Sequence, residues 1–425
     1  MEYSDGVETW LSKVREQVNL KVIRIPFSAS AEWTMTDGWL IHKSGRFFQV
    51  VGIQKDDLQH QSHAQPFLRQ LEVGTLGFVF HDYELLMQAK AEPGNVGVVQ
   101  MAPTCQATAS NLDRVHGGIA PLFSEWFTYR SKNSVYDSLQ SEQGSRFFGK
   151  FNRNVLAIAG GKVSSNANFR WTPVDAILEL MHDDCLINTD ARSAIVCSPW
   201  ELLVNREPFT RISSSFAEDL AASLAAPISN HRIEDELRSA RTMVHRPSII
   251  RLDELDGWQV GEGSIMPLDK KPFEIYQVRV DAATREVSNW DQPILSSFGE
   301  GYAELVCGRI EGVLYFLFSF QSEAGLGNAI ELGPSLIVEP GEALTKSTYQ
   351  SGPNAVVLAE YRQSDEGGRF YQDVSTYKLI DIGEVPVDLI YEKWLTLAEI
   401  HSLLRAGGWF TNEARSALSL ILFWL

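Results

Sequence analysis

The sequence repeats itself, and this repetition constrains the fold more than any other feature. Trp171 recurs as Trp394, and Ala191–Ala194 (ARSA) recurs as Ala414–Ala417, in both cases 223 positions later. The motif SEQGSRF, which begins at Ser141, returns as SDEGGRF at the same spacing. Self-similarity at a fixed spacing indicates that each copy forms one structural unit. We therefore predict two homologous domains that pack about a pseudo-two-fold axis.

Further matches define the extent of each copy. QPFL at Gln65 returns as QPIL at Gln292, offset by 227, and AEPGN with Glu92 returns as SEAGL with Glu323, offset by 231. We interpret the changes in offset as loop insertions. The length of 425 residues fits two domains of ordinary size. The predicted division is a first repeat over residues 1–216, a helical linker over 217–246 and a second repeat over 247–425.

Composition excludes several classes of protein. The net charge of -17 leaves no surplus of Lys and Arg to neutralise phosphates, which disfavours nucleic-acid binding. The four cysteines lack the spacing of a zinc site and predict a reducing compartment. His60 and His63 have HxxH spacing without an evident third ligand, so we predict no metal site. No apolar run reaches membrane-helix length and the N-terminus is unlike a signal peptide, so we expect a cytoplasmic protein.

The stretch from Leu85 to Gly118 is the best candidate for a functional site. It begins with the alternation of a strand, whose apolar face carries Leu85, Met87, Ala89 and Ala91. The opposite face carries Gln88, Lys90 and Glu92. An amide, an ammonium and a carboxylate on one face have no packing role, so we expect them to face solvent or a site. Pro93 and Gly94 then turn the chain.

The loop after this strand is rich in neutral hydrogen-bonding side chains, which suit a polyhydroxylated ligand. The candidate ligand-binding residues of this region are Gln88, Asn95, Gln100, Thr104, Gln106, Thr108 and Asn111, together with His116. In the second copy Lys90 is replaced by Gln321 and Asn95 by Leu326, and the loop becomes largely apolar. We therefore expect the catalytic centre in the first copy. The second copy is either structural or holds a vestigial ligand site.

Several elements flank this stretch. Residues 1–20 predict a helix, and Ser134–Gly160 predicts two strands joined by a glycine turn. Phe169–Asp184 predicts a helix with Thr172 as N-cap and Pro173 as its first residue, and a second helix is expected within Leu186–Cys197.

Several motifs of the sequence resemble those of a known family, the nucleotide-diphosphate hexose 2,3-dehydratases of deoxysugar biosynthesis. The resemblance rests on QAKAEPGN, QMAPTCQAT, SNLDRVHGG, SEQGSRFF and, in the second copy, SEAGLGNAIELGPS and SDEGGRF. It implies an α+β chain of two tandem Nudix-like α/β domains, a homodimer, and dTDP-4-keto-6-deoxyglucose as substrate. It also implies loss of the C2 hydroxyl without a redox cofactor, in a natural-product pathway where a 3-ketoreductase acts next.

Such a hydro-lyase needs a base for the acidified C3 proton and an acid for the departing C2 oxygen. We assign these roles to Glu92, Lys90 and His116, and the sequence leaves open which is base and which is acid. The alternative for Lys90 and Glu92 is a surface ion pair, and the alternative for His116 is a solvated or capping histidine. Neither a G-x-G-x-x-G fingerprint nor a Walker loop occurs.

Other residues have two interpretations. Glu142 and Arg146 recur in the second copy as Asp365 and Arg369, which favours a structural role, with Arg146 on the diphosphate as the alternative. Asn152, Arg153 and Asn154 lack counterparts there, which favours substrate binding. Trp126 and Tyr129 are either stacking partners for thymine or core residues.

Two other functions compete with the dehydratase. One is a catalytically silent nucleotide-sugar binding protein descended from it, which intact Lys90, Glu92 and His116 argue against. The other is a Nudix-type pyrophosphohydrolase, which is disfavoured because the sequence has no glutamate-rich metal-binding Nudix helix.

Overall fold

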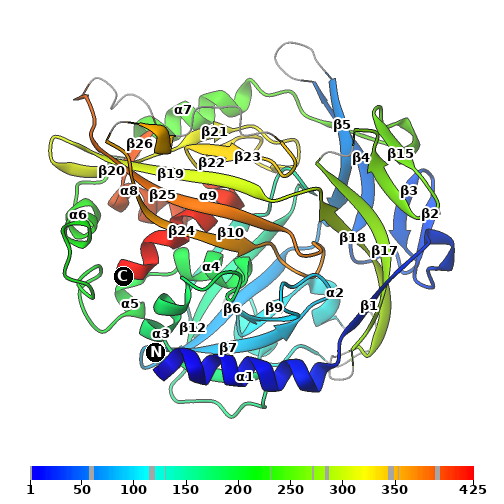
Figure 1. Cartoon of the computed structure of the whole chain (residues 1–425), viewed down its shortest axis with the longest axis horizontal. Coiled ribbons are helices and arrows are strands. Elements are labelled where there is room, and N and C mark those ends of the chain that lie inside the picture. Colours follow the sequence, from blue (N-terminus) through cyan, green and yellow to red (C-terminus); the bar gives the residue numbers. More distant parts are fainter. Residues whose placement is uncertain are drawn as a thin grey trace.

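The chain is a mixed α+β protein built mostly from strands, seen in a computed structural model (Figure 1). The structure describes residues 2–56, 62–113, 120–129, 131–229, 231–269, 272–282, 287–342, 349–352, 354–387 and 393–425.

The first half contains a seven-stranded sheet that carries the candidate stretch. Its path runs β10 (Ser134–Ser141), β12 (Phe151–Ile158), β6 (Gly74–His81), β7 (Glu84–Ala91) and β13 (Phe169–Pro173). Two short strands complete it, with β8 (Val99–Ala102) beside β7 and β9 (Cys105–Ala107) beside β6. Strands β12 and β6 are parallel and the other pairs are antiparallel.

The second half contains a sheet with the same strand order. Its path runs β24 (Val356–Ser364), β25 (Val374–Glu384), β19 (Gly301–Ile310), β20 (Val313–Leu317) and β26 (Trp394–Thr396), with β23 (Leu336–Val338) beside β19. Strands β25 and β19 are again the parallel pair. Nearby, β21 (Ser319–Gln321) pairs with β22 (Glu331–Gly333). Trp171 and Trp394, matched in the sequence, occupy equivalent edge strands of the two sheets.

Two helices that carry the repeated ARSA motif pack against each other between these sheets (Figure 1). They are α4 (Thr189–Val196), which contacts β6 and β12, and α9 (Asn412–Leu418), which contacts β19 and β25. The small side chains of Ala191 and Ala414 are fully buried there. Across the contact, Arg415 Nε donates to Ser193 Oγ at 2.9 Å. The small residues of ARSA permit this close helix approach.

The remaining helices cover the outside of the two sheets or connect them. They are α1 (Glu2–Val18), α2 (Ala109–Leu112), α3 (Val174–Leu180), α5 (Trp200–Leu203), α6 (Ser215–Leu224), α7 (His231–Thr242) and α8 (Leu397–Ala406). Helix α1 lies along β7 because Val7, Leu11, Val14 and Val18 form one apolar stripe at helical spacing.

Two further sheets exchange strands between the halves. In one, β1 (Lys21–Ile25) joins β17 (Phe273–Asp281), beside β16 (Ser264–Pro267), β15 (Trp258–Val260) and β18 (Asn289–Ser297). In the other, β14 (Ser248–Ile250) joins β4 (Gln49–Asp56), beside β5 (Ser62–Arg69), β3 (Trp39–His42), β2 (Trp33–Thr36) and β11 (Phe147–Phe148). Each half therefore gives one strand to a sheet of the other half.

The halves also interlock through glycine turns. Gly94 N donates to Gly367 O at 2.8 Å, and Gln372 N donates back to Gly94 O at 2.8 Å. A Cβ added at Gly94 would lie 1.6 Å from the carbonyl oxygen of Phe370. Only glycine permits so close an approach of two backbones. The turn after Glu92 is thus fixed by the loop that carries Arg369.

Most expected elements are confirmed, and one expectation is wrong. Helix α1, strand β7, strands β10 and β12, and helix α4 occur where the sequence predicts them. Thr172 is not an N-cap, because residues through Pro173 continue strand β13 against β7. Pro173 itself is the N-cap of α3 and forms no side-chain cap. Within the described ranges, no helix is long and apolar enough to span a membrane.

Candidate active site

A cavity of about 600 Å³ opens beside strand β7, and residues from both halves line it. The first half contributes His42, Phe48, Gln70, Gln88, Lys90, Glu92, Thr104, Gln106, Thr108, Asn111, Asn152 and Asp190, among others. The second half contributes Asn289, Trp290, Asp291, Gln292, Gly368 and Arg369, among others. Cavities of this size hold small organic ligands.

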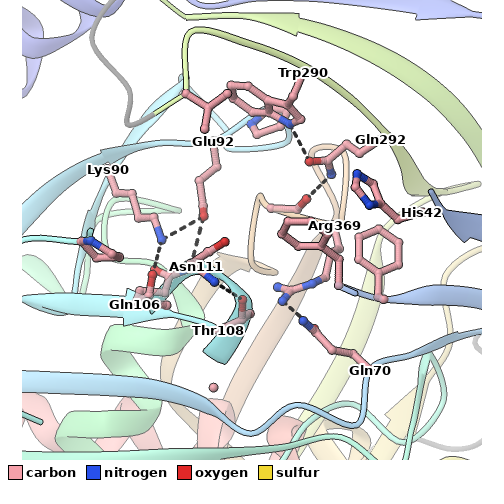
Figure 2. A pocket seen from close by; sticks show the side chains of 18 of the residues that line it. His42, Gln70, Lys90, Glu92, Gln106, Thr108, Asn111, Trp290, Gln292 and Arg369 are labelled. Carbon is pink, nitrogen blue, oxygen red and sulfur yellow. Dashed lines mark hydrogen bonds and ion pairs between the residues drawn. The ribbon is translucent and has the colours of Figure 1, made fainter. Parts of the chain in front are cut away.

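Lys90 and Glu92 face each other on the wall of the cavity (Figure 2). Lys90 Nζ lies 3.1 Å from Glu92 Oε1, and Glu92 is only 5% exposed. The same Nζ donates to Gln106 O at 2.9 Å. An ion pair so well shielded from water is stronger than a surface pair, since screening is weak there. The polar face of β7 thus presents a fixed carboxylate and a fixed cation to the cavity.

Gln106 connects this pair to the start of helix α4. Its side-chain amide approaches both carboxylate oxygens of Glu92 at 3.4 Å, and Asn188 Nδ2 donates to its Oε1 at 2.9 Å. Asn188 is the N-cap of α4, because its side chain accepts from Ala191 N. Glu92 is therefore held from two directions, by Lys90 and by Gln106.

The floor of the cavity holds Asp190, in the first turn of α4. Asp190 is 4% exposed, and burial is the main cause that raises its pKa well above the usual value. The nearby carboxylates of Glu142, Glu366 and Glu92 add to this rise, while Lys90 opposes it. The surroundings of Asp190 therefore favour its protonated form more than water does.

Arg369 enters this cavity from the second half. Its guanidinium donates to Gln70 Oε1 at 2.8 Å (Figure 2). It also donates to Glu366 Oε1 at 2.5 Å, and the two contacts fix its orientation. Burial raises the pKa of Glu366 to about 7; Arg369 opposes the rise and Glu92 contributes to it. Arg369 is a fixed cation beside the carboxyl groups of the floor.

The rim of the cavity is aromatic. Trp33 packs against His42 and Phe48, with ring centroids 5.4 and 4.7 Å apart. Burial lowers the pKa of His42, so its neutral form is favoured. From the second half, Trp290 Nε1 donates to Gln292 Oε1 at 2.8 Å (Figure 2). The cavity therefore combines an aromatic rim with a charged interior.

Some residues proposed from the sequence lie at this cavity and others do not. Those at its wall are Gln88, Lys90, Glu92, Thr104, Gln106, Thr108, Asn111 and Asn152. Thr104 also has a structural role, because its hydroxyl accepts from Val79 N and donates to Leu86 O. Thr108 caps helix α2 by accepting from Asn111 N. His116 lies outside the described residues.

The other proposed residues lie away from the cavity wall. Asn95 binds the backbone of Lys90 and Val98, and Gln100 binds Cys185 O and Ser364. Glu142 accepts from Asn152, while Arg153 pairs with Asp137 and Asn154 donates to Ser193. Trp126 packs in a small apolar cluster, and Tyr129 is 73% exposed.

Arg146 lines a different and much smaller cavity, of about 30 Å³, in the second half. There it donates to Glu339 Oε2 at 2.5 Å. Its sequence counterpart Arg369 is the arginine at the large cavity. Each arginine loop thus reaches the cavity formed by the other half's sheet.

Sequence reasoning missed Asp190, Trp290, Gln292 and Arg369. A signal for each was present, since Arg369 lies within the repeated SDEGGRF motif and Asp190 directly precedes the repeated ARSA motif; both motifs were interpreted only as evidence of a sequence repeat. Gln292 was marked only by the QPIL match, and Trp290 lies two residues before it. The sequence does not show that this strand of the second half covers the site.

Comparisons with known proteins agree on one family. A family model described as NDP-hexose 2,3-dehydratase matches residues 4–198 and 232–421. A protein of Streptomyces violaceoruber named dTDP-4-dehydro-6-deoxy-alpha-D-glucopyranose 2,3-dehydratase is 32% identical over 98% of this chain and 96% of its own length. Proteins with that name from Amycolatopsis orientalis and Saccharopolyspora spinosa are also 32% identical, over 98% and 96% of this chain and 90% and 89% of their own lengths. The chain belongs to the NDP-hexose 2,3-dehydratase family.

The chemistry of this dehydratase family needs a proton acceptor, a proton donor and a group that stabilises negative charge. The large cavity offers Glu92, Asp190 with its raised pKa, and the basic side chains of Lys90 and Arg369. Among the described residues, no group of three or more His, Cys, Asp and Glu side chains is arranged to hold a metal ion.

Proposed function

We propose that this chain is a hydro-lyase that removes the C2 hydroxyl of dTDP-4-keto-6-deoxyglucose and yields the 2-deoxy-3,4-diketo sugar. The family membership and the names of the three relatives support the reaction. The observation that carries the proposal is the Lys90–Glu92 pair on the wall of a cavity large enough for a ligand. Its aromatic rim suits a nucleobase, and its polar wall suits sugar hydroxyls.

The C4 carbonyl acidifies the C3 proton, so one base is sufficient to remove it. Glu92 is the proposed base, and His116 is the alternative that the sequence leaves open. Lys90 lies beside Glu92, where its charge stabilises the enolate oxygen that forms on C4. Expulsion of the C2 oxygen from this enolate leaves an enol, which tautomerises to the diketone. None of these steps calls for a redox cofactor.

The test separates exchange at C3 from loss of the C2 oxygen. The substrate is incubated in heavy water with the parent protein and with Glu92→Gln, His116→Asn and Lys90→Met. Loss of the base should reduce C3 exchange by about 10²- to 10⁴-fold. Glu323→Gln, at the counterpart of Glu92 in the second half, is the matched control and should keep the parent rate. Parent-rate dehydration by all three site variants would show that the chemistry lies elsewhere.

Each of the two alternative functions predicts a different experimental result. A silent binding protein would bind dTDP-sugar without exchange or water loss in the parent protein. A Nudix-type pyrophosphohydrolase would cleave the diphosphate and would lose activity with a chelator and regain it with a divalent ion. We expect the parent protein to dehydrate its substrate fully in the presence of the chelator.

Finer points follow from the same proposal. We propose that the two halves, residues 1–216 and 247–425, arose by duplication of one Nudix-like unit; the shared strand order supports this. A homodimer, a downstream 3-ketoreductase and a cytoplasmic location remain predictions from the sequence.

A further inference from the structure

We propose that Asp190 is a catalytic residue of this chain and donates the proton that the C2 oxygen needs in order to leave as water. This inference rests on the proposed dehydratase function. It begins from the position of Asp190, which lines the large cavity together with Glu92. The Asn188–Gln106–Glu92 chain of hydrogen bonds ties the start of α4 to Glu92, and Asp190 lies two residues after Asn188.

The other protic groups of the cavity are less suited to this step. Lys90 directs its ammonium to Glu92 Oε1 and Gln106 O, and both contacts hold its protons in place. Arg369 does not release a proton in the physiological range. Glu366 is buried behind Arg369 and is not among the residues that line the cavity. Asp190 lines the cavity, and burial raises its pKa well above the usual value, which suits a proton donor.

The surroundings of Asp190 suit a group that gives up a proton and then regains it. Burial and the carboxylates of Glu142, Glu366 and Glu92 favour the neutral acid before the reaction. Lys90 and Arg369 interact electrostatically with the same carboxyl and stabilise its anion after the proton has left. The N-terminal turn of α4 also favours the anion, but more weakly than burial opposes it.

The proton balance closes over the whole reaction. The base takes the C3 proton, and the C–H electron pair forms the C4 enolate. As the enolate collapses, the C2–O electron pair leaves with the oxygen, Asp190 supplies its proton, and water departs. The enol left on C2 and C3 then loses its O–H proton to the Asp190 carboxylate, while the protonated base delivers a proton to C2. Both groups return to their starting forms.

The experiment compares Asp190→Asn and Asp190→Ser with Glu413→Gln. Glu413 is the counterpart of Asp190, is equally buried and lines the small cavity, so it is the matched control. In heavy water, both Asp190 variants should retain C3 exchange while water loss falls by about 10²- to 10⁴-fold. Glu413→Gln should keep both rates.

A second substrate separates proton donation from a merely structural role. In the 2-deoxy-2-fluoro analogue of the substrate, fluoride departs without needing a proton. Asp190→Asn should therefore eliminate fluoride within a few-fold of the parent rate. Parent-rate water loss by either Asp190 variant would overturn the proposal, as would loss of exchange and fluoride elimination together with water loss. A parent protein inactive on the substrate would instead refute the proposed function.

Discussion

The two cavities occupy equivalent places in the two halves but differ about twenty-fold in volume, about 600 Å³ against about 30 Å³. Thr108 at the large cavity corresponds to Glu339 at the small one, where the longer side chain reaches Arg146 at 2.5 Å. Gln106 corresponds to Ile337, and Lys90 corresponds to Gln321. An ion pair across the small cavity therefore occupies space that is open in the large one.

One structural contact is the same in both halves. Ser335, the counterpart of Thr104, accepts from Val306 N and donates to Leu317 O, as Thr104 does with Val79 and Leu86. Thr104 and Ser335 therefore keep the same structural contacts, whereas Thr108, Gln106 and Lys90 differ from their counterparts. This separation explains how one cavity closes while the shared architecture persists.

The largest effect is expected from the glycine turns. In Gly94→Ala the new Cβ meets Phe370 O at 1.6 Å, and in Gly325→Ala it meets Phe147 O at 1.8 Å. Because a backbone carbonyl cannot move aside easily, each variant should lose about 3 kcal/mol or more of unfolding free energy. Only Gly94→Ala should also lose activity in its folded fraction, since this turn follows Glu92. Urea unfolding and dehydration assays measure the two effects, and equal activity losses would contradict the comparison.

The two arginines offer a more selective test. Arg369→Lys should reduce kcat/KM by about 10- to 100-fold, because Lys lacks the fixed planar donors that Arg369 presents to the cavity and ~1.5–3 kcal/mol of charge-assisted bonding is at stake. Arg146→Lys should leave kcat/KM within a few-fold of the parent value, although it removes a comparable buried arginine. Steady-state kinetics measures kcat/KM for both variants. Equal losses of kcat/KM in the two variants would show that Arg369 contributes only to stability.

Opening the small cavity has a smaller expected effect. Glu339→Thr imitates Thr108 and leaves Arg146 without its carboxylate partner, so the unfolding free energy should fall by ~1–3 kcal/mol. Dehydration should continue at the parent rate. The double variant Glu339→Thr with Arg146→Met removes both partners and should regain part of the loss. A drop in dehydration with either protein would mean that the small cavity contributes to catalysis.

The last prediction concerns the pH dependence of stability. Glu366 has a pKa of about 7 in the folded protein against 4.5 as its usual value, so folding takes up a proton between these pH values. Stability from this group therefore falls as pH rises from about 4.5 to 7. Glu366→Gln, which imitates Gln143 in the first copy, should show a shallower fall in urea unfolding measured from pH 5 to pH 8. An identical slope in parent and variant would contradict the assignment.

The sequence predicts local structure well and contacts across the halves poorly. Strand β7 and helix α4 were predictable, because alternation and capping are local patterns. Thr172 was assigned to a helix because Thr-Pro is a helix-start signal, but pairing with β7 overrides it. The equivalence of Arg146 and Arg369 was visible, yet the sequence does not show that each reaches the cavity of the other half. That exchange depends on the backbone hydrogen bonds of Gly94 and Gly367, which leave no periodic pattern.

The interlocked turns also bear on how the protein is made. On the ribosome, the segment with Glu92 emerges long before Gly367 and Arg369, which the cavity requires. At ordinary rates of protein synthesis, roughly 5–20 residues per second, the delay is on the order of 15–60 s. During this interval the nascent first half lacks the residues that complete the cavity and the partner of the Gly52–Gln54 stretch of β4. The late arrival of the second half sets the earliest moment at which the chain can bind its substrate.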